Sequence, residues 1–336
     1  MRSLSLGAII AASWLARRLS VEQVSGLGAM IGWWLGMGGR RTARAYANLA
    51  AVMPETSMAE RKAIVRGAWD NFGRTIAESL VLDRLVADPD RITLTNPEAL
   101  EVCGKDGRGT VFVAIHFANW ELTSIPIVRS GIAPMTVYKP LKDKEVTDWL
   151  VRNREPFQPG GMHPASRATL LRLTRHVRTG GAICLSGDHR DTAGIAVPFF
   201  GRPASSGALP GLLAVRYKAR VFGVRVDRLP NARFTLTLEP VEVADTGDEQ
   251  ADVEATTAAI QATFEHWIRA KPGMWRWFYR RWDGPYAGPA REDGDLHWGE
   301  IDGAALSEDT LSEPDTTVPG AATSETPMAP RRASTG

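Results

Sequence analysis

Short apolar runs alternate with stretches of helical spacing along the middle of the chain. The apolar runs predict β-strands, and the stretches with apolar positions three or four residues apart predict helices. The predicted strands are residues 110–115, 135–138, 182–186, 220–226 and 234–241, and the predicted helices are residues 145–152, 166–179, 207–217 and 251–270. This alternation indicates an α/β fold with a mostly parallel sheet flanked by helices. A turn at Pro230-Asn231 predicts that the last two strands form an antiparallel pair at one side.

Two uncharged, apolar stretches open the sequence, at residues 4–16 and 24–39. The first lacks the upstream charge and the cleavage site of a signal peptide, so we expect it to be retained. Both are shorter than the ~20 residues that span a bilayer upright. Arginines follow each stretch: Arg17, Arg18, Arg40, Arg41 and Arg44. We therefore predict a membrane-associated helical anchor over residues 1–45 whose arginines face anionic headgroups, with a soluble helical hairpin packed on the domain as the alternative.

The rest of the chain divides into three parts by spacing and composition. Residues 46–90 are predicted to be accessory helices, with an amphipathic helical pattern over residues 57–85 that ends at Asp88-Pro89. Residues 91–290 are predicted to form the α/β domain. Residues 291–336 are rich in small, polar and acidic residues and almost lack large apolar ones, so we predict a disordered acidic tail.

Charge and tryptophan are distributed unevenly. The chain has 40 Lys and Arg and 38 Asp and Glu residues, of which residues 291–336 hold three and ten, so residues 1–290 carry a net charge of +9. A basic body suits nucleic acid, an anionic membrane or an acidic protein. The eleven Trp residues favour the membrane, because indole rings prefer the water–lipid boundary. Six of them form two groups: Trp14, Trp33 and Trp34 near the start, and Trp275, Trp277 and Trp282 later in the chain. The second group is equally consistent with a buried core.

The strand at residues 110–115 ends at His116, and Glu121 follows five residues later. In one continuous helix these two side chains would point about 140° apart. A strand-to-helix turn would instead bring them together, so that the Glu121 carboxylate orients the imidazole and stabilises its protonated form. Open α/β sheets also bind ligands at the carboxyl ends of their strands. The pattern therefore predicts a catalytic pair, with a structural histidine as the alternative.

Five motifs in sequence order resemble those of the glycerolipid acyltransferase superfamily, and in particular its lipid A lauroyl/myristoyl acyltransferase branch. They are His116-Phe-Ala-Asn119-Trp120-Glu121, Tyr138-Lys139-Pro140, Gly187-Asp188-His189-Arg190-Asp191, Val197-Pro-Phe-Phe-Gly201 and Met274-Trp-Arg-Trp-Phe-Tyr-Arg-Arg281. The likeness covers roughly residues 5–285. Two departures stand out. Lys139 replaces a common Arg and so loses the planar guanidinium, and the Asp188 element continues with further polar residues.

The resemblance implies a glycerolipid-acyltransferase-like fold and an enzyme of lipid A, and hence lipopolysaccharide, biosynthesis. A fatty acyl chain would pass from an acyl carrier protein to a hydroxyl of a lipid A precursor at the cytoplasmic face of the cell inner membrane. His116 would act as general base oriented by Glu121, while backbone N–H groups after His116, helped by Arg167, would stabilise the oxyanion. The implied substrate-binding residues are Asn119, Tyr138, Lys139, Arg167, Asp188 and His189. The resemblance implies no cofactor, no metal and no nucleic-acid partner.

Other functions are compatible with parts of the sequence. The acceptor could be another glycolipid, such as an inositol mannoside. A metal-dependent hydrolase could gather cation ligands from a set of five residues, although none has the close spacing of a zinc enzyme. Those residues are His116, Glu121, Asp188, His189 and Asp191. A non-enzymatic membrane-associated binder of carrier protein is a third alternative, whereas a serine hydrolase is disfavoured because no Gly-x-Ser-x-Gly motif occurs.

The two cysteines, Cys103 and Cys184, are too few for a disulfide framework. Cys184 lies in an apolar run that reads as a strand. We expect both to be reduced packing residues.

Overall fold

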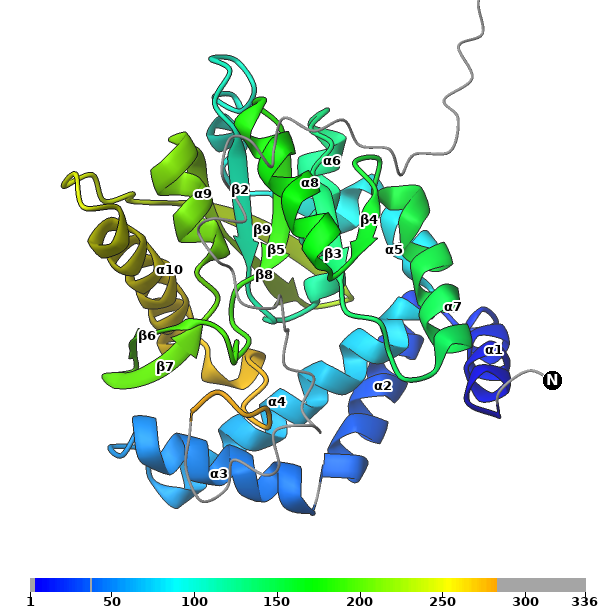
Figure 1. The fold of residues 1–336 in the computed structure, drawn as a ribbon. Helices are drawn as coiled ribbons and strands as arrows, with labels where there is room; N and C mark the ends of the chain where they lie inside the picture. Colours follow the sequence, from blue (N-terminus) through cyan, green and yellow to red (C-terminus); the bar gives the residue numbers. More distant parts are fainter. Residues whose placement is uncertain (1–3, 37, 283–336) are drawn as a thin grey trace, which may run out of the picture. The chain divides into compact units, whose positions relative to one another are not determined.

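A seven-stranded β-sheet forms the centre of the α/β domain (Figure 1). Its strands lie in the order β1, β9, β8, β2, β5, β3 and β4. They are β1 (Ile92–Leu94), β2 (Thr110–Ala114), β3 (Met135–Tyr138), β4 (Met162–Pro164), β5 (Ala182–Ser186), β8 (Arg220–Leu229) and β9 (Arg233–Val241). The structure, a computed structural model, describes residues 4–36 and 38–282, which all fall within one unit over Met1–Ile301. The tail predicted over residues 291–336 lies outside the described residues.

The sheet is mostly parallel, as predicted. β2 pairs in parallel with β5 on one side and with β8 on the other, and β3 pairs in parallel with β5 and β4. β8 and β9 are antiparallel, and β1 pairs in parallel with β9. Every residue of β2 is buried, which explains its uninterrupted apolar run Val111-Phe112-Val113. The sequence pattern does not predict β1 and β4, because each has three residues and no clear alternation.

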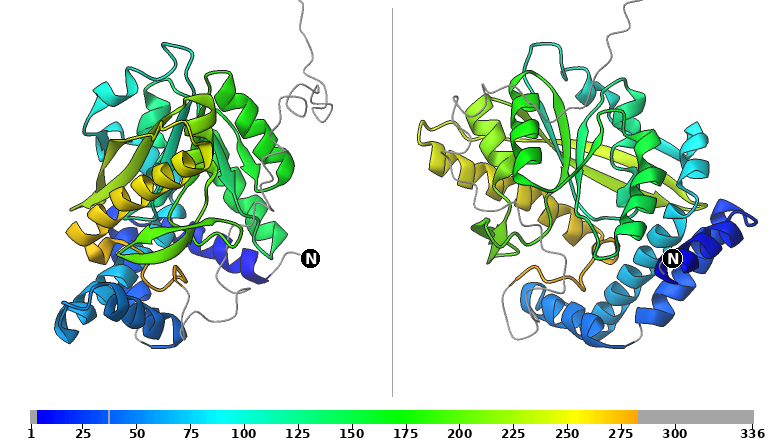
Figure 2. Two further views of the ribbon diagram at one scale, coloured as in Figure 1. Left: turned by 60° about the vertical axis from the view of Figure 1, so that its left-hand side comes forward. Right: turned by 45° about the vertical axis from the view of Figure 1, so that its right-hand side comes forward.

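Helices cover both faces of this sheet (Figure 2). α8 (Arg167–Arg178) packs on β5, α9 (Leu209–Tyr217) on β2 and β8, and α10 (Glu249–Ala270) on β8 and β9. α6 (Ile125–Arg129) and α7 (Lys144–Arg154) connect strands in the opposite direction along the sheet, so right-handed crossovers place them on the other face. The four predicted helices of this region are confirmed as α7 to α10. Short 3₁₀ segments complete it: η1 (Pro89–Arg91), η2 (Pro97–Leu100), η3 (Trp120–Leu122), η4 (Glu155–Phe157) and η5 (Pro272–Met274).

Further helices precede the sheet in the chain. They are α1 (Leu4–Ala16), α2 (Val21–Gly36), α3 (Arg40–Val52), α4 (Met58–Ser79) and α5 (Leu82–Ala87). A reciprocal pair of hydrogen bonds between Ser57 and Glu60 caps the start of α4. The single helix predicted over residues 57–85 is in fact two helices. The backbone N–H groups of Leu80 and Val81 bond three residues back, which tightens the end of α4 into a turn.

A stripe of glycines allows α2 and α4 to approach closely. Gly28, Gly32 and Gly36 lie four residues apart on one face of α2, and a Cβ atom on Gly32 would overlap the carbonyl oxygen of Trp69 in α4. A Cβ atom on Gly73 of α4 would likewise overlap the carbonyl oxygen of Gly28. This face of α2 therefore packs on the protein, as the alternative of a packed hairpin requires.

Other faces of α1 and α2 leave large apolar side chains exposed. Trp34, Leu35 and Met30 are 65%, 63% and 58% exposed, respectively. The further members are Leu4, Trp14, Leu15, Leu27, Ile31 and Trp33. We call these nine residues the N-terminal apolar face. None of the helices among the described residues is long and apolar enough to cross a membrane.

One detail of the predicted anchor is wrong. Arg44 is buried and donates to the carbonyl oxygen of Phe278, so it does not face headgroups. The second tryptophan group, Trp275, Trp277 and Trp282, is buried in the core. There the Trp282 indole N–H donates to the carbonyl oxygen of Phe199, at the end of a hairpin formed by β6 (Ile195–Phe199) and β7 (Arg202–Ser206).

The glycine stripe predicts a strong dependence of stability on residue size in α2. Gly32→Val should lower the free energy of unfolding by about 1–3 kcal/mol or more, because the added side chain forces α2 away from α4. Thermal and denaturant unfolding would measure this change. Gly26→Ala is the matched control, since a Cβ at Gly26 of the same helix meets no atom within 4 Å. That control should keep or raise the stability, and an equal loss in both variants would contradict the packing argument.

Candidate active site

The register of β2 and β5 places His116 beside Asp188. The two strands are parallel neighbours, and Ala114 of β2 pairs with Ser186 of β5. His116 and Asp188 each follow two residues after these paired positions. Both therefore leave the sheet at the carboxyl ends of its central strands, where α/β sheets hold their ligands.

Asp188 holds His116 through two hydrogen bonds, one to its imidazole and one to its backbone N–H. The carboxylate oxygen Oδ1 lies 2.7 Å from Nδ1 of His116, and Oδ2 accepts from the backbone N–H of His116 at 3.1 Å. The indole N–H of Trp275 also donates to Oδ2, at 2.9 Å. Because a carboxylate accepts, Nδ1 carries the proton and Nε2 keeps a lone pair. This arrangement makes His116 a base whose ring orientation is fixed.

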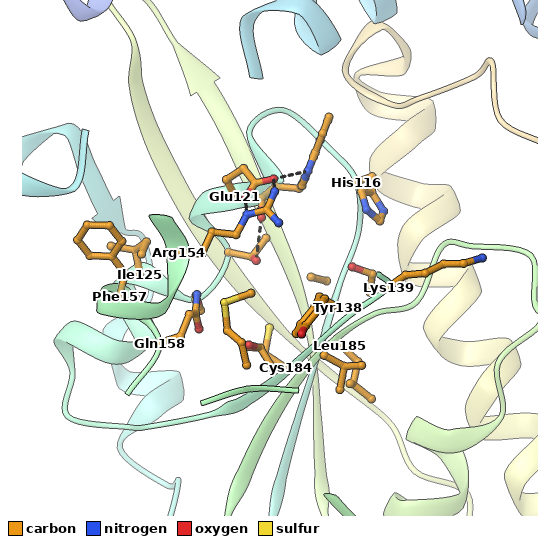
Figure 3. Close-up of a pocket in the computed structure, with 18 of the residues that line it drawn as sticks. His116, Glu121, Ile125, Tyr138, Lys139, Arg154, Phe157, Gln158, Cys184 and Leu185 are labelled. Carbon is orange, nitrogen blue, oxygen red and sulfur yellow. Dashed lines mark hydrogen bonds and ion pairs between the residues drawn. The ribbon is translucent and has the colours of Figure 1, made fainter. Parts of the chain in front are cut away.

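Glu121 does not hydrogen-bond to His116 as the spacing predicts, although its negative charge does raise the pKa of His116. Its carboxylate faces Arg154 of α7, with Oε1 2.6 Å from Nη2 and Oε2 2.6 Å from Nε (Figure 3). The indole N–H of Trp120 donates to Oε1 at 3.1 Å. The strand-to-helix turn is present, since η3 begins directly after Asn119. The partners differ from the predicted ones because two residues distant in sequence intervene: Arg154 binds Glu121, and Asp188 binds His116.

Asn119 is part of a buried polar network rather than of the cavity wall. Its side chain is fully buried, donates to Glu78 at 2.7 Å and accepts the backbone N–H of Glu121 at 3.1 Å. Glu78 of α4 also accepts from Ser25 of α2 at 2.6 Å and forms an ion pair with Arg228 of β8. Asn119 thus fixes the turn that carries Glu121.

A cavity of about 290 Å³ opens beside His116 (Figure 3). Among the residues proposed from sequence, it is lined by His116, Glu121, Tyr138, Lys139 and His189. Apolar side chains on its wall include Ile125, Phe157, Met162, Cys184 and Leu185. Asn119, Arg167 and Asp188 are not among its lining residues, and Arg167 is exposed at the start of α8. Because the lining combines apolar side chains with about as many polar ones, the cavity suits an amphipathic ligand.

Burial and charge set the protonation states around His116. Burial, followed by the positive charge of Arg276, lowers the pKa of His116, whereas Asp188 raises it. The pKa of Asp188 is lowered although burial acts to raise it, because His116 and its hydrogen bond favour the carboxylate. Burial also raises the pKa of the Cys184 thiol to about 12. At neutral pH the site therefore has an ionised Asp188, a neutral His116 and a protonated thiol.

Three buried or half-buried side chains of the site also allow the alternative of a metal site to be considered. His116, Asp188 and His189 each offer a ligand atom within 4.8 Å of the others. However, Nδ1 of His116 bonds to Asp188, and the guanidinium of Arg276 lies 3.4 Å from Nε2 of His189. A bound cation would lie beside this buried positive charge. The surroundings therefore favour proton transfer over cation binding.

Several residues of the site were not found from sequence. Arg154 lies in a helix with ordinary exposed charges, so no local pattern marks it as the partner of Glu121. Gln158 bonds to Ser124 in the cavity wall at 2.6 Å, again without a sequence signal. Trp275 and Arg276 do lie in a motif that resembles the family, but the motif does not reveal that they contact Asp188 and His189.

Comparison with known proteins adds two findings. A sequence model of the family described as bacterial lipid A biosynthesis acyltransferase matches residues 2–283, which include every residue of this site. The chain is also 27% identical over 183 residues to a phosphatidylinositol mannoside acyltransferase from Mycolicibacterium smegmatis. That alignment covers 52% of this chain and 57% of the relative, so the chain spans a little over half of the relative's length.

The charges around His116 predict opposite effects of two substitutions on its pKa. Arg276→Gln should raise the pKa because it removes a positive neighbour, and Asp188→Asn should lower it because it removes a negative one. NMR titration of the imidazole would measure both shifts, with His163 as an internal reference. In the unchanged protein, His116 should still be neutral at a pH just below ~6.5, the ordinary histidine pKa, and should become protonated only at lower pH. Shifts in the same direction would contradict this assignment.

Proposed function

Because the chain belongs to the bacterial lipid A biosynthesis acyltransferase family, we propose that it transfers a fatty acyl group from a thioester to a hydroxyl of a glycolipid. The observation that carries the proposal is the neutral His116, held by Asp188 in the wall of a cavity that has both apolar and polar side chains. A hydroxyl is a weak nucleophile at neutral pH, so a positioned base is the main chemical requirement of this reaction.

His116 acts as the general base in the proposed mechanism. Its Nε2 takes the proton of the acceptor hydroxyl as the oxygen attacks the thioester carbonyl carbon. Asp188 accepts the hydrogen bond from Nδ1–H and stabilises the imidazolium that forms. The tetrahedral intermediate then collapses, the C–S bond breaks, and the departing sulfur takes the proton from Nε2. The products are an ester and a thiol, and His116 returns to its neutral form.

Glu121 supports this site mainly through Arg154, and its charge also raises the pKa of His116. The two side chains form a bidentate ion pair in the cavity wall. Such a pair fixes the guanidinium, which can then present its remaining N–H groups to a polar part of a substrate. The catalytic role implied by resemblance for Glu121 thus becomes a positioning role, and Tyr138, Lys139 and His189 remain the proposed substrate contacts.

The proposed donor is an acyl group carried by acyl carrier protein. The net charge of +9 over residues 1–290 supports this choice, because an acidic carrier would be attracted to a basic body. No cofactor is required for the reaction, since a thiolate is a good leaving group. Acyl transfer from a carrier-linked donor should be faster than from a coenzyme A thioester, and should slow as salt screens the attraction.

Two glycolipid classes are proposed as acceptors. The family description supports a lipid A precursor. The relative from Mycolicibacterium smegmatis supports an inositol mannoside as the second candidate. Parallel assays with both acceptors, followed by mass spectrometry of the products, would discriminate between them.

The N-terminal apolar face supports a location at the cytoplasmic face of an inner membrane. Because α2 packs on α4 through its glycine stripe, the opposite face is left to enter the lipid boundary while the helix stays attached to the protein. Arg18, which lies over the Trp14 ring, would meet anionic headgroups at this surface. An enzyme placed in this way would meet its lipid acceptor without extracting it fully from the bilayer.

Substitutions of the catalytic pair test the mechanism. His116→Ala should lower the rate of acyl transfer by about 10²–10⁴, the usual contribution of general-base catalysis. Asp188→Asn should lower it comparably, and the double variant should be scarcely slower than His116→Ala, because the two residues act as one unit. Glu121→Gln should retain more activity than either single variant. The measurement is product formation from a carrier-linked donor and a lipid A precursor.

His266→Ala, at an exposed position of α10, is the control for loss of a histidine and should retain full activity. Near-normal turnover in His116→Ala would refute the base assignment. Absence of transfer by the intact protein with all acyl donors and acceptors would instead favour the non-enzymatic binder.

The membrane proposal predicts weakened lipid binding after substitution of the N-terminal apolar face. Trp34→Glu with Leu35→Glu should reduce binding to anionic vesicles by more than about tenfold, because each fully buried apolar side chain contributes about 1.5–3 kcal/mol. Vesicle co-sedimentation measures the bound fraction. Val102→Glu is the control, since Val102 is an exposed apolar residue outside α1 and α2, in the segment between η2 and β2. Unchanged binding of the double variant, or equal loss in the control, would contradict the proposal.

A further inference from the structure

Fewer backbone donors are free for the oxyanion of the proposed reaction than the sequence predicts. Backbone N–H groups after His116 are the expected source. However, the N–H groups of Phe117 and Ala118 already donate to the carbonyl oxygens of Ile115 and Met274, at 2.7 and 3.2 Å. The N–H of Glu121 donates to the Asn119 side chain. Three of the expected donors are therefore occupied, and Arg167 lies exposed on α8.

His189 presents a nitrogen that could fill this role. It follows Asp188 directly and lines the cavity, and its ring centroid lies 4.3 Å from that of His116 at an interplanar angle of 79°. Its Nδ1 is buried and has no hydrogen-bond partner within the described part of the chain. A buried polar nitrogen without a partner is costly, so it is expected to meet one when a ligand enters.

Arg276 determines which nitrogen of His189 carries the proton. Its Nη2 lies 3.4 Å from Nε2 of His189, a long contact in which the guanidinium must be the donor. Nε2 is then the acceptor, and in the neutral ring Nδ1 carries the hydrogen. Burial keeps the pKa of His189 well below its ordinary value, so the ring is neutral. Nδ1 of His189 is thus an N–H donor.

The guanidinium of Arg276 is itself held in place by aromatic rings. It lies over the ring of Trp120 at 4.9 Å and over that of Tyr279 at 4.1 Å, and the residue is 9% exposed. Trp120 also lines the cavity. Arg276 is therefore a fixed positive charge directly behind the imidazole of His189.

We propose that the Nδ1–H of His189 donates a hydrogen bond to the oxyanion that forms on the donor carbonyl during acyl transfer, and that Arg276 is the positioning residue that fixes this tautomer. The inference rests on the proposed function. His116 and His189 then divide the work: the first moves the proton of the attacking hydroxyl, and the second binds the charge that develops on the carbonyl oxygen. One such donor typically contributes about 10²–10³ in turnover.

Three substitutions of His189 test which nitrogen acts. His189→Phe keeps the ring and removes both nitrogens, so single-turnover acyl transfer should slow by about 10²–10³. His189→Asn places an amide nitrogen near the position of Nδ1 and should recover at least tenfold of that loss. His189→Gln places its amide nitrogen near Nε2 and should recover little. His163→Phe is the matched control, since His163 has a similar 3.4 Å contact with Arg172 but does not line the cavity.

A spectroscopic measurement addresses the tautomer without any substrate. In the intact protein, the ¹⁵N shifts of His189 should show the proton on Nδ1, and Arg276→Gln should give a mixture of tautomers. A proton on Nε2 in the intact protein would overturn the proposal, as would normal transfer in His189→Phe or equal recovery in the Asn and Gln variants. Complete inactivity of the intact protein would refute the proposed function, while the tautomer measurement would still report on His189.

Discussion

The hydrogen bond between Asp188 and Nδ1 of His116 is the interaction on which the rest of the site depends. It exists because β2 and β5 are parallel neighbours, and their register places both residues just beyond the strands at the same edge of the sheet. It fixes the tautomer of His116 and leaves Nε2 as the basic atom. The indole of Trp275 secures Asp188 from the other side, which ties the buried C-terminal segment to the same carboxylate. The register of two neighbouring strands thus determines which nitrogen of His116 is protonated.

A second carboxylate, that of Glu78, links this loop to the N-terminal helices. Glu78 is fully buried and bonds to Ser25 of α2, Arg228 of β8 and Asn119 of the loop after β2. Removing one partner of a buried ion pair commonly costs about 3–5 kcal/mol, because the other charge is left uncompensated. The helices that carry the N-terminal apolar face are therefore joined to the turn that carries Glu121 by hydrogen bonds rather than by apolar packing alone.

Local patterns predicted much of the fold and less of the site. β2, β3 and β5 are recoverable from their apolar runs, and α7 to α10 from helical spacing, because these signals lie within single elements. The residues around His116 were also identifiable, but their partners were not. Asp188 lies 72 residues from His116 and Arg154 lies 33 residues from Glu121, so each pairing depends on tertiary packing. For this reason a spacing of five residues pointed to Glu121, whereas the carboxylate that hydrogen-bonds to His116 is that of Asp188. Arg44 was misjudged and Trp275 left open for a similar reason, since the sequence does not show what covers a basic or aromatic side chain.

The protonated thiol of Cys184 has a kinetic consequence for the proposed reaction. Cys184 lines the cavity, yet burial in β5 keeps its sulfur from ionising near neutral pH, so it is not available to take the acyl group as an enzyme-bound thioester. Only Nε2 of His116 has a lone pair that can accept a proton, and the acceptor hydroxyl must bind there. Acyl transfer without a covalent intermediate requires the protein to bind the thioester and the alcohol at the same time. The reaction then follows a ternary-complex kinetic mechanism rather than a ping-pong mechanism.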